Sequence, residues 1–201
     1  MNEITKMSSE KLGTLIGESL RFRVGKDERT LDLEDLNALV NVEAIIEKAK
    51  DLHQPDKRKP YGRAVVFAQR DLEAMVATWT PGLPCAPHDH GGSFGAVRIL
   101  QGRAQHTLWR IQDGQLVKVH EHFAEAGETL CCEPSLVHSI GDAGPADGSG
   151  ETPRTLHMYT ESIDHMMVYD VPNKRTLVVD GGCGAWTPYD QPEFIRDQAE
   201  G

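Results

Sequence analysis

The N-terminal quarter of the chain repeats apolar residues at helical spacing. Leu12, Leu15 and Ile16 form one such set, and a longer apolar set follows it. Acidic residues precede the second set at Asp32-Leu-Glu-Asp, a composition that favours a helix start. The pattern predicts two or three short helices within about residues 1–56. We interpret them as a cap that covers one face of the main domain.

Beyond a turn-rich segment at residues 57–62, the pattern changes to short runs of β-branched and aromatic residues. Gly, Pro, Asp and Asn separate these runs, as in an all-β barrel or sandwich. Asp113-Gly114 lies between two runs and predicts a tight hairpin. The predicted strands cover residues 63–69, 74–80, 95–100, 104–111, 116–123, 128–132, 154–160 and 175–179.

Two later segments lack this alternation. Residues 143–153 are rich in Gly, Pro and small polar residues, which predicts an exposed, flexible loop between two strands. The tail after Pro188 is predicted to be loose surface chain.

A length of 201 residues is most simply one domain. We therefore expect a single domain over 1–201, with a barrel core at about 61–180.

Charge and composition narrow the classes of partner. The chain has 21 basic and 31 acidic residues and no basic run, which disfavours nucleic acid and anionic membranes as partners. No apolar run approaches the ~20 residues that cross a bilayer. The first residues lack the basic-then-apolar pattern of a signal segment. We expect a cytoplasmic protein, monomeric or a small homo-oligomer, that acts on a small molecule.

The most distinctive polar motif is a pair of histidines framed by Pro and Gly. On an extended strand, His88 and His90 would point to one side and Asp89 to the other. Two converging imidazoles make half of a metal site. His138 follows a predicted strand and a turn at Pro134, among apolar residues. It is our candidate for a third ligand from a neighbouring strand.

The other histidines, the cysteines and the tryptophans receive structural interpretations. His120 and His122 have charged neighbours and no Gly or Pro framing, so we expect an exposed strand face there. His106 and His165 are interpreted as structural. No two cysteines have CxxC spacing, so the cysteine pattern indicates neither a disulfide framework nor a zinc ribbon. We interpret the cysteines as buried or incidental thiols: Cys85, Cys131, Cys132 and Cys183. The tryptophans are interpreted as packing residues: Trp79, Trp109 and Trp186.

Spaced glycines around the histidine pair carry a resemblance to a known superfamily. The segment from Gly82 to Gly102 reproduces the first motif of the cupins. It consists of Gly82, five residues, His88-x-His90, four residues, Gly95, six residues and Gly102. Gly95 replaces the glutamate that is usual there. The resemblance implies a cupin-type β-barrel (jelly roll), so the expected fold is all-β with appended N-terminal helices.

Further segments resemble one branch of that superfamily. Gly127…Pro134…His138 is similar to the second cupin motif, and H-D-H followed by G-G-S-F-G-A-V-R-I-L-Q-G resembles the cysteine dioxygenase type I (thiol dioxygenase) family. The match extends from about Tyr61 to Tyr159. Animal members carry a cysteine at position 95 that is crosslinked to the active-site tyrosine. Gly95 cannot form that crosslink, as in the bacterial members.

The resemblance implies roles for two further motifs. Tyr61-Gly-Arg63 matches the family's Y-x-R, whose arginine binds the substrate carboxylate in a bidentate fashion. Thr155-Leu-His157-Met-Tyr159 matches the S-x-H-x-Y triad, with Thr155 at the serine position. These three residues alternate along one strand and so share a face. We expect the Thr155 hydroxyl to orient His157, and His157 to hold the Tyr159 hydroxyl near the metal.

The resemblance also implies a metal and a reaction. His88, His90 and His138 match the family's three iron ligands. Three neutral imidazoles leave coordination positions open for O2 chemistry at Fe(II), although such sites also hold zinc. The residues alone leave iron and zinc open, and the resemblance implies Fe(2+). The family oxidises cysteine to cysteine sulfinate with both atoms of O2.

Several alternatives stay open at this point. Arg63 favours cysteine, since relatives selective for 3-mercaptopropionate tend to carry glutamine there; mercaptosuccinate is another candidate substrate. A zinc or nickel cupin acting as an isomerase, hydrolase or lyase would prefer a carboxylate ligand, which Gly95 does not supply. A third hypothesis is a non-catalytic cupin that binds a small acid.

Overall fold

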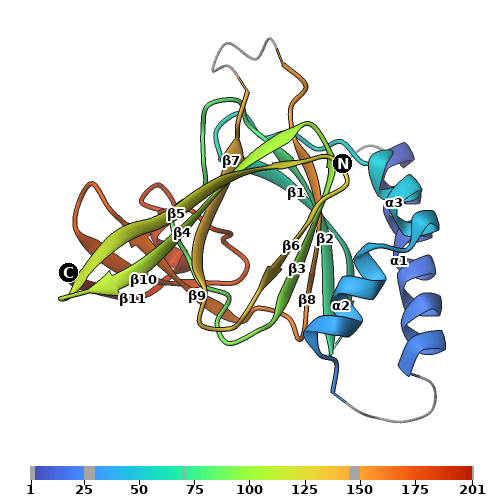
Figure 1. The fold of residues 1–201 in the computed structure, drawn as a ribbon, viewed down its shortest axis with the longest axis horizontal. Coiled ribbons are helices and arrows are strands. Elements are labelled where there is room, and N and C mark those ends of the chain that lie inside the picture. The colour runs from blue at the N-terminus through green and yellow to red at the C-terminus, as the bar shows by residue number, and fades with distance from the viewer. Residues whose placement is uncertain (1–2, 25–29, 70, 145–149, 201) are drawn as a thin grey trace.

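Three helices cover one wall of a β-barrel in the computed structural model (Figure 1). The structure describes residues 3–24, 30–69, 71–144 and 150–200. The helices are α1 (Glu3–Val24), α2 (Leu33–Val40) and α3 (Glu43–Lys50). The prediction of short helices is right for α2 and α3 and wrong for α1, which is 22 residues long.

Glycine explains how the long α1 fits against the barrel. A Cβ atom on Gly13 would lie 2.2 Å from the carbonyl oxygen of Val66, so only glycine allows α1 to approach β1 this closely. At α2, the Asp32 side chain accepts from the Asp35 N–H while Asp35 accepts from the Asp32 N–H, a reciprocal cap. The predicted helix start at Asp32 is confirmed.

The strands follow the predicted order. They are β1 (Tyr61–Gln69), β2 (Leu72–Trp79), β3 (Gly95–Gln101), β4 (Arg103–Gln112), β5 (Gln115–Glu125), β6 (Thr129–Cys132), β7 (Val137–Asp142), β8 (Arg154–Tyr159), β9 (His165–Asp170), β10 (Arg175–Asp180) and β11 (Ile195–Glu200). The predicted strands correspond to eight of these with ends shifted by a few residues. The sequence predicted neither β9 nor β11, and it indicated β7 only as a neighbouring strand that carries His138, without bounds. The all-β class with appended helices is confirmed.

The tail prediction is wrong. Residues after Pro188 form a short 3₁₀ helix and then β11, which pairs antiparallel with β10. The sequence of β11 is polar, so its alternation gives no signal. Backbone pairing stabilises it, together with the Arg196 side chain, which forms ion pairs with Asp164 and Asp180. Of the segment predicted as a flexible loop, residues 145–149 lie outside the described residues.

Two walls enclose the barrel, and the loop that contains His88 joins the two sheets of the second wall. The first wall has the order β1-β2-β8-β3-β6. The second contains the sheets β5-β4-β7 and β11-β10-β9, and His88 forms isolated bridges to both His138 of β7 and Val168 of β9. The Asp113-Gly114 hairpin between β4 and β5 is confirmed, with φ of 50° and 76°. This is the cupin-type barrel that the motifs predict.

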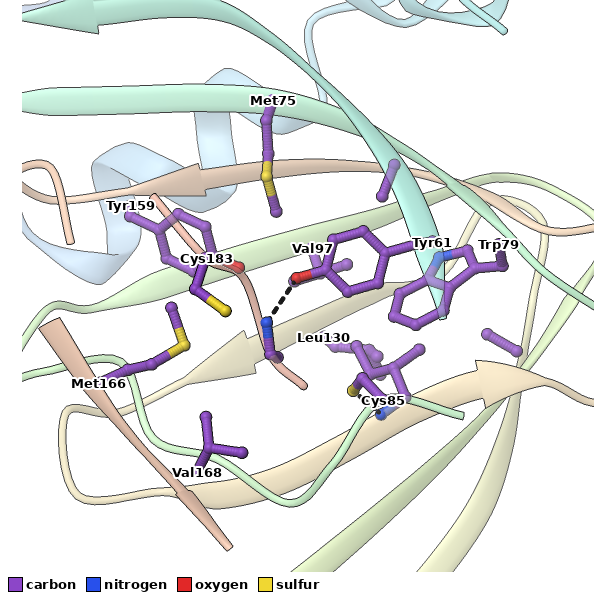
Figure 2. Packing of buried hydrophobic residues seen from close by; sticks show 14 of the residues in the cluster. Tyr61, Met75, Trp79, Cys85, Val97, Leu130, Tyr159, Met166, Val168 and Cys183 are labelled. Carbon is purple, nitrogen blue, oxygen red and sulfur yellow. Dashed lines mark hydrogen bonds between the residues drawn. The ribbon is translucent and has the colours of Figure 1, made fainter. Parts of the chain in front are cut away.

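Alternating residues divide the interior into two cores. On β2, β3 and β8, side chains such as Met75, Val97 and Tyr159 point into the barrel (Figure 2). Their neighbours in sequence pack on the helices, where Leu12 and Leu36 are fully buried. The first wall is therefore apolar on both faces. Across residues 3–24, 30–69, 71–144 and 150–200, no helix has the length and apolar character needed to span a bilayer.

Candidate metal centre

Three buried histidines converge inside the barrel. One ring nitrogen from each of His88, His90 and His138 lies within 4.8 Å of the corresponding atoms of the other two. The Nε2 atoms of His90 and His138 are 3.1 Å apart. The structure thus brings together the three histidines that the sequence pointed to, from two segments almost fifty residues apart.

Backbone pairing explains why these distant histidines meet. The His88 N–H donates to the His138 carbonyl at 2.9 Å, and the His138 N–H donates back to the His88 carbonyl at 3.0 Å. His88 and His90 therefore belong to a loop between β2 and β3 rather than to the regular strand that we expected. The φ of Gly91 is 60°, a left-handed conformation that turns the chain directly after His90.

Asp89 points away from the metal centre and anchors the same loop to β9. Its carboxylate accepts hydrogen bonds from the backbone N–H groups of Met167 at 2.8 Å and Gly91 at 3.2 Å. The Asp89 N–H also donates to the Met167 carbonyl at 3.1 Å. The loop that carries two imidazoles is thus held by β7 on one side and by β9 on the other.

Hydrogen bonds define which nitrogens remain free for a metal. The Nδ1 atom of His88 lies 2.9 Å from the Ala86 carbonyl oxygen, so Nδ1 carries the proton and donates it, leaving Nε2 free. The Nδ1 atom of His138 lies 2.8 Å from Nε2 of His106. A proton on His138 Nδ1 can be donated to His106, which again frees Nε2 of His138.

Burial keeps these imidazoles neutral, which is the form that binds metals. It lowers the pKa of His88, and it lowers the pKa values of His90 and His138 further, with neighbouring imidazoles acting in the same direction. Two nitrogens that are each about 2.0–2.1 Å from one ion lie roughly 3 Å apart, as Nε2 of His90 and of His138 do. The three residues fit a divalent transition metal.

Arg63 and Tyr61 extend the site along β1. The Arg63 guanidinium lines one cavity with His88, His90 and Tyr159. Its Nη1 donates to the Gly181 carbonyl at 3.1 Å, and its Nη2 donates to the Gly182 carbonyl. The Tyr61 hydroxyl accepts from the Ala185 N–H at 3.0 Å, as Figure 2 shows. Both acceptors belong to the turn after β10, so Arg63 ties β1 to the C-terminal sheet at the edge of this cavity.

The three residues of the Thr-x-His-x-Tyr motif form a buried hydrogen-bonded chain. Thr155 Oγ1 lies 2.7 Å from His157 Nε2, and His157 Nδ1 lies 2.9 Å from the Tyr159 hydroxyl. Burial lowers the pKa of His157 to about 3 and raises the pKa of Tyr159 well above its ordinary value. Both groups are therefore uncharged near neutral pH.

Trp79 determines which group donates and which accepts along this series of hydrogen bonds. Its indole N–H donates to Thr155 Oγ1 at 2.9 Å and cannot accept in return. The Thr155 hydroxyl satisfies its own proton by donating to Nε2 of His157, which places the imidazole proton on Nδ1. That proton is donated to the Tyr159 oxygen, so the Tyr159 hydroxyl proton is free to point into the cavity.

Gly95 leaves room for the Tyr159 ring. A Cβ atom at Gly95 would lie 2.9 Å from Cε1 of Tyr159, which is closer than unbonded atoms approach. Gly95 also occupies the position of the usual cupin glutamate, so the candidate metal centre offers three imidazoles and no carboxylate among the described residues.

His106 and Trp79 are the contacts that the sequence interpretation missed. Both were assigned to structure or packing, yet His106 contacts His138 and Trp79 contacts Thr155. The signal available for His106 was its own position, which faces inward on the strand that pairs with the strand of His138. His120 is exposed, as expected, whereas His122 is half-buried with its ring 4.9 Å from that of His106.

A known protein family and several solved structures are similar to this chain. The sequence profile of the family described as cysteine dioxygenase type I matches residues 32–171. Among solved structures, an uncharacterized conserved protein with a double-stranded β-helix domain from Klebsiella pneumoniae is 18% identical, with a TM-score of 0.46 over 60% of this chain and 92% of that one. KdgF from Halomonas sp. is 15% identical, with a TM-score of 0.42 over 56% and 90% of the two chains.

Proposed function

Since the chain belongs to the cysteine dioxygenase type I family, we propose that it is a non-haem Fe(II) enzyme that oxidises a small carboxylated thiol with O2. L-cysteine is our first candidate substrate and cysteine sulfinate the product. The observation that carries the proposal is the joint lining of one cavity by metal-site imidazoles and the Arg63 guanidinium. Bound Fe(II) would supply open coordination positions for the thiolate and O2, and redox chemistry between them.

Arg63 supports an acid-bearing substrate. A guanidinium makes paired, charge-assisted hydrogen bonds to a carboxylate, a geometry that lysine or glutamine does not reproduce. Its present acceptors, the Gly181 and Gly182 carbonyls, are neutral and hold the guanidinium at the cavity. We propose that Arg63 fixes the substrate carboxylate and that Tyr61, beside it on β1, shapes this end of the cavity.

Tyr159 supports proton donation to the bound ligands. Its hydroxyl proton is free once His157 donates to its oxygen, and the residue lines the cavity beside His90, with ring centroids 5.1 Å apart. We propose that Thr155 and His157 position Tyr159 and that Tyr159 donates a hydrogen bond to charge developing on the reacting atoms.

The overall reaction is balanced without another co-substrate. Both oxygen atoms of O2 form bonds to sulfur while the bond between them breaks, so sulfur is oxidised, O2 is reduced, and the thiol becomes a sulfinate. The cavity lining of Met75, Ile163, Met166 and Ala185 is apolar and limits access of water to the sulfur.

A reducing compartment suits this chemistry, and we propose the cytoplasm. All four cysteines are free thiols in the structure. Burial raises the pKa of Cys85 and of Cys132 to about 12, so both stay protonated and unreactive beside the proposed oxidising site.

Oxygen uptake tests the proposal. The protein is reconstituted anaerobically with Fe(II) and then offered cysteine, 3-mercaptopropionate, mercaptosuccinate or cysteamine with O2. We expect uptake with cysteine, little with cysteamine because it lacks the carboxylate for Arg63, and loss of uptake in a His138→Ala variant. Uptake with none of the thiols would contradict a thiol dioxygenase and would favour a non-oxygenase metal cupin, such as an isomerase, hydrolase or lyase.

A further inference from the structure

Glu73 places a carboxyl group in the cavity that the proposed reaction does not use. It belongs to β2 and pairs in register with Tyr159 of β8, on the face of the first wall that points into the barrel. Its side chain lines the same cavity as Arg63, His88 and His90. The cavity therefore contains one fixed cation and one acidic group beside the metal-site imidazoles.

The acidic group is available to a ligand. Arg63 donates to the carbonyl groups of Gly181 and Gly182 rather than to the Glu73 carboxylate. Glu73 is only half-buried, and burial raises the pKa of its carboxyl group, while the Arg63 charge and a hydrogen bond from Ser162 act in the opposite direction. Because its hydrogen-bond partner Ser162 is neutral, the Glu73 carboxylate gains from a ligand that brings its own charged donor.

A cavity with separated positive and negative poles is complementary to a zwitterion. A carboxylate on the ligand matches Arg63, and amine N–H groups match Glu73. Without the amine, Glu73 would keep only its hydrogen bond from Ser162, and a second carboxylate on the ligand near Glu73 would place two like charges together. Because such repulsion is stronger in a confined site than in water, it discriminates as effectively as a favourable contact does.

We propose that Glu73 is a specificity residue that selects thiols bearing both an amine and a carboxylate, of the cysteine type, over thiols that bear carboxylates only. The assignment rests on the proposed thiol dioxygenase function and narrows its substrate class. Arg63 recognises any acid-bearing thiol, and Glu73 supplies the distinction among them.

Binding can be measured without turnover. The Fe(II)-loaded protein is titrated anaerobically, by calorimetry, with cysteine, 3-mercaptopropionate and mercaptosuccinate. The second of these has hydrogen in place of the amine, and the third lacks the amine and carries a second carboxylate on the carbon that bears sulfur. We compare the wild type with Glu73→Gln, which keeps the size and polarity of the side chain and removes its charge. Glu161→Gln removes a charge from an exposed position just after β8 and is the matched control.

We expect the wild type to bind cysteine more tightly than mercaptosuccinate, and Glu73→Gln to shrink that ratio by about tenfold or more, chiefly by improving mercaptosuccinate binding. Glu161→Gln should leave the ratio unchanged. The same ratio of kcat/KM values, measured by O2 uptake, should change in parallel. Circular dichroism and thermal unfolding establish that each variant is folded.

An unchanged binding ratio in folded Glu73→Gln would overturn the proposal, as would a wild type that binds mercaptosuccinate as tightly as cysteine. These outcomes are distinct from failure of the proposed function. If the wild type consumes no O2 with any thiol, the dioxygenase fails, whereas the binding ratios still decide whether Glu73 distinguishes amine-bearing acids from diacids.

Discussion

At the scale of single residues, the candidate metal centre depends on partners that orient two of its three imidazoles. His88 is held by a backbone carbonyl, whereas His138 is held by the imidazole of His106 at 2.8 Å. His106 is itself 3% exposed, and burial lowers its pKa to about 4, so it stays a neutral acceptor. Outer contacts of this kind tune metal affinity as well as ligand orientation.

We expect His106→Phe to weaken metal binding by about tenfold to a hundredfold, because Nδ1–H of His138 loses its acceptor. Fe(II) titration monitored by metal content after desalting measures the effect. His165→Gln, at an exposed position, is the control and should retain wild-type affinity. Equal metal affinity in His106→Phe and the wild type would contradict a role for His106 in orienting His138.

We expect Tyr159→Phe to retain its metal and lose about a hundredfold in kcat, since only the proposed hydrogen-bond donor is removed. Metal analysis and O2 uptake are measured on the same sample. Tyr169→Phe removes a hydroxyl that donates a hydrogen bond to the Met167 sulfur, at 3.9 Å, and should keep both properties. Loss of metal from Tyr159→Phe would show that the hydroxyl serves the metal centre and not the reaction.

Much of the site could be predicted because its residues occur as short local motifs. His88 and His90, and likewise Thr155, His157 and Tyr159, are spaced by two, which places each set on one face of an extended segment. His106 and Trp79 are isolated in sequence. Their importance arises from contacts across strands that alternation alone does not specify, namely β4 with β7 and β2 with β8.

At the scale of elements, the C-terminal sheet holds the histidine loop in place. Strand β9 receives the Asp89 side chain, and the Gly181–Gly182 turn after β10 receives Arg63. Periodicity predicted β10, whereas β9 and β11 were not predicted. The contribution of β11 is backbone pairing rather than apolar burial, which explains why a polar sequence forms a strand there.

We expect Asp89→Ala to lower the free energy of unfolding by about 1–3 kcal/mol, because it removes the acceptor for the N–H groups of Met167 and Gly91. The loosened loop should also bind metal less tightly. Asp89→Asn keeps an oxygen acceptor and should lose less in both measurements. Denaturant unfolding and metal titration test this, and equal losses in the two variants would mean that charge, not the hydrogen bonds, anchors the loop.

At the scale of the whole molecule, the helices and the barrel share one apolar layer. The outward face of β2, β3 and β8 forms a continuous core with α1, α2 and α3. Figure 1 shows the helices along this wall only, on the outside of the barrel that contains the metal centre. This arrangement supports our expectation that the helical segment and the barrel form a single domain.

We expect Leu36→Ala, which truncates a fully buried side chain of α2, to cost about 2–5 kcal/mol of stability. Helix content by far-ultraviolet circular dichroism and barrel structure by tryptophan fluorescence should be lost together, since all three tryptophans follow the helical segment. Leu83→Ala, with the leucine 40% exposed, should change stability little. Helices that melt before the barrel would contradict a single cooperative unit.

The proposed chemistry is tested most directly by the origin of the product oxygens. The Fe(II)-loaded protein is given cysteine and isotopically heavy O2 in ordinary water, and the sulfinate is analysed by mass spectrometry. Our account predicts that both sulfinate oxygens are heavy. A product whose oxygens come from water, or the absence of any oxidised product, would contradict it.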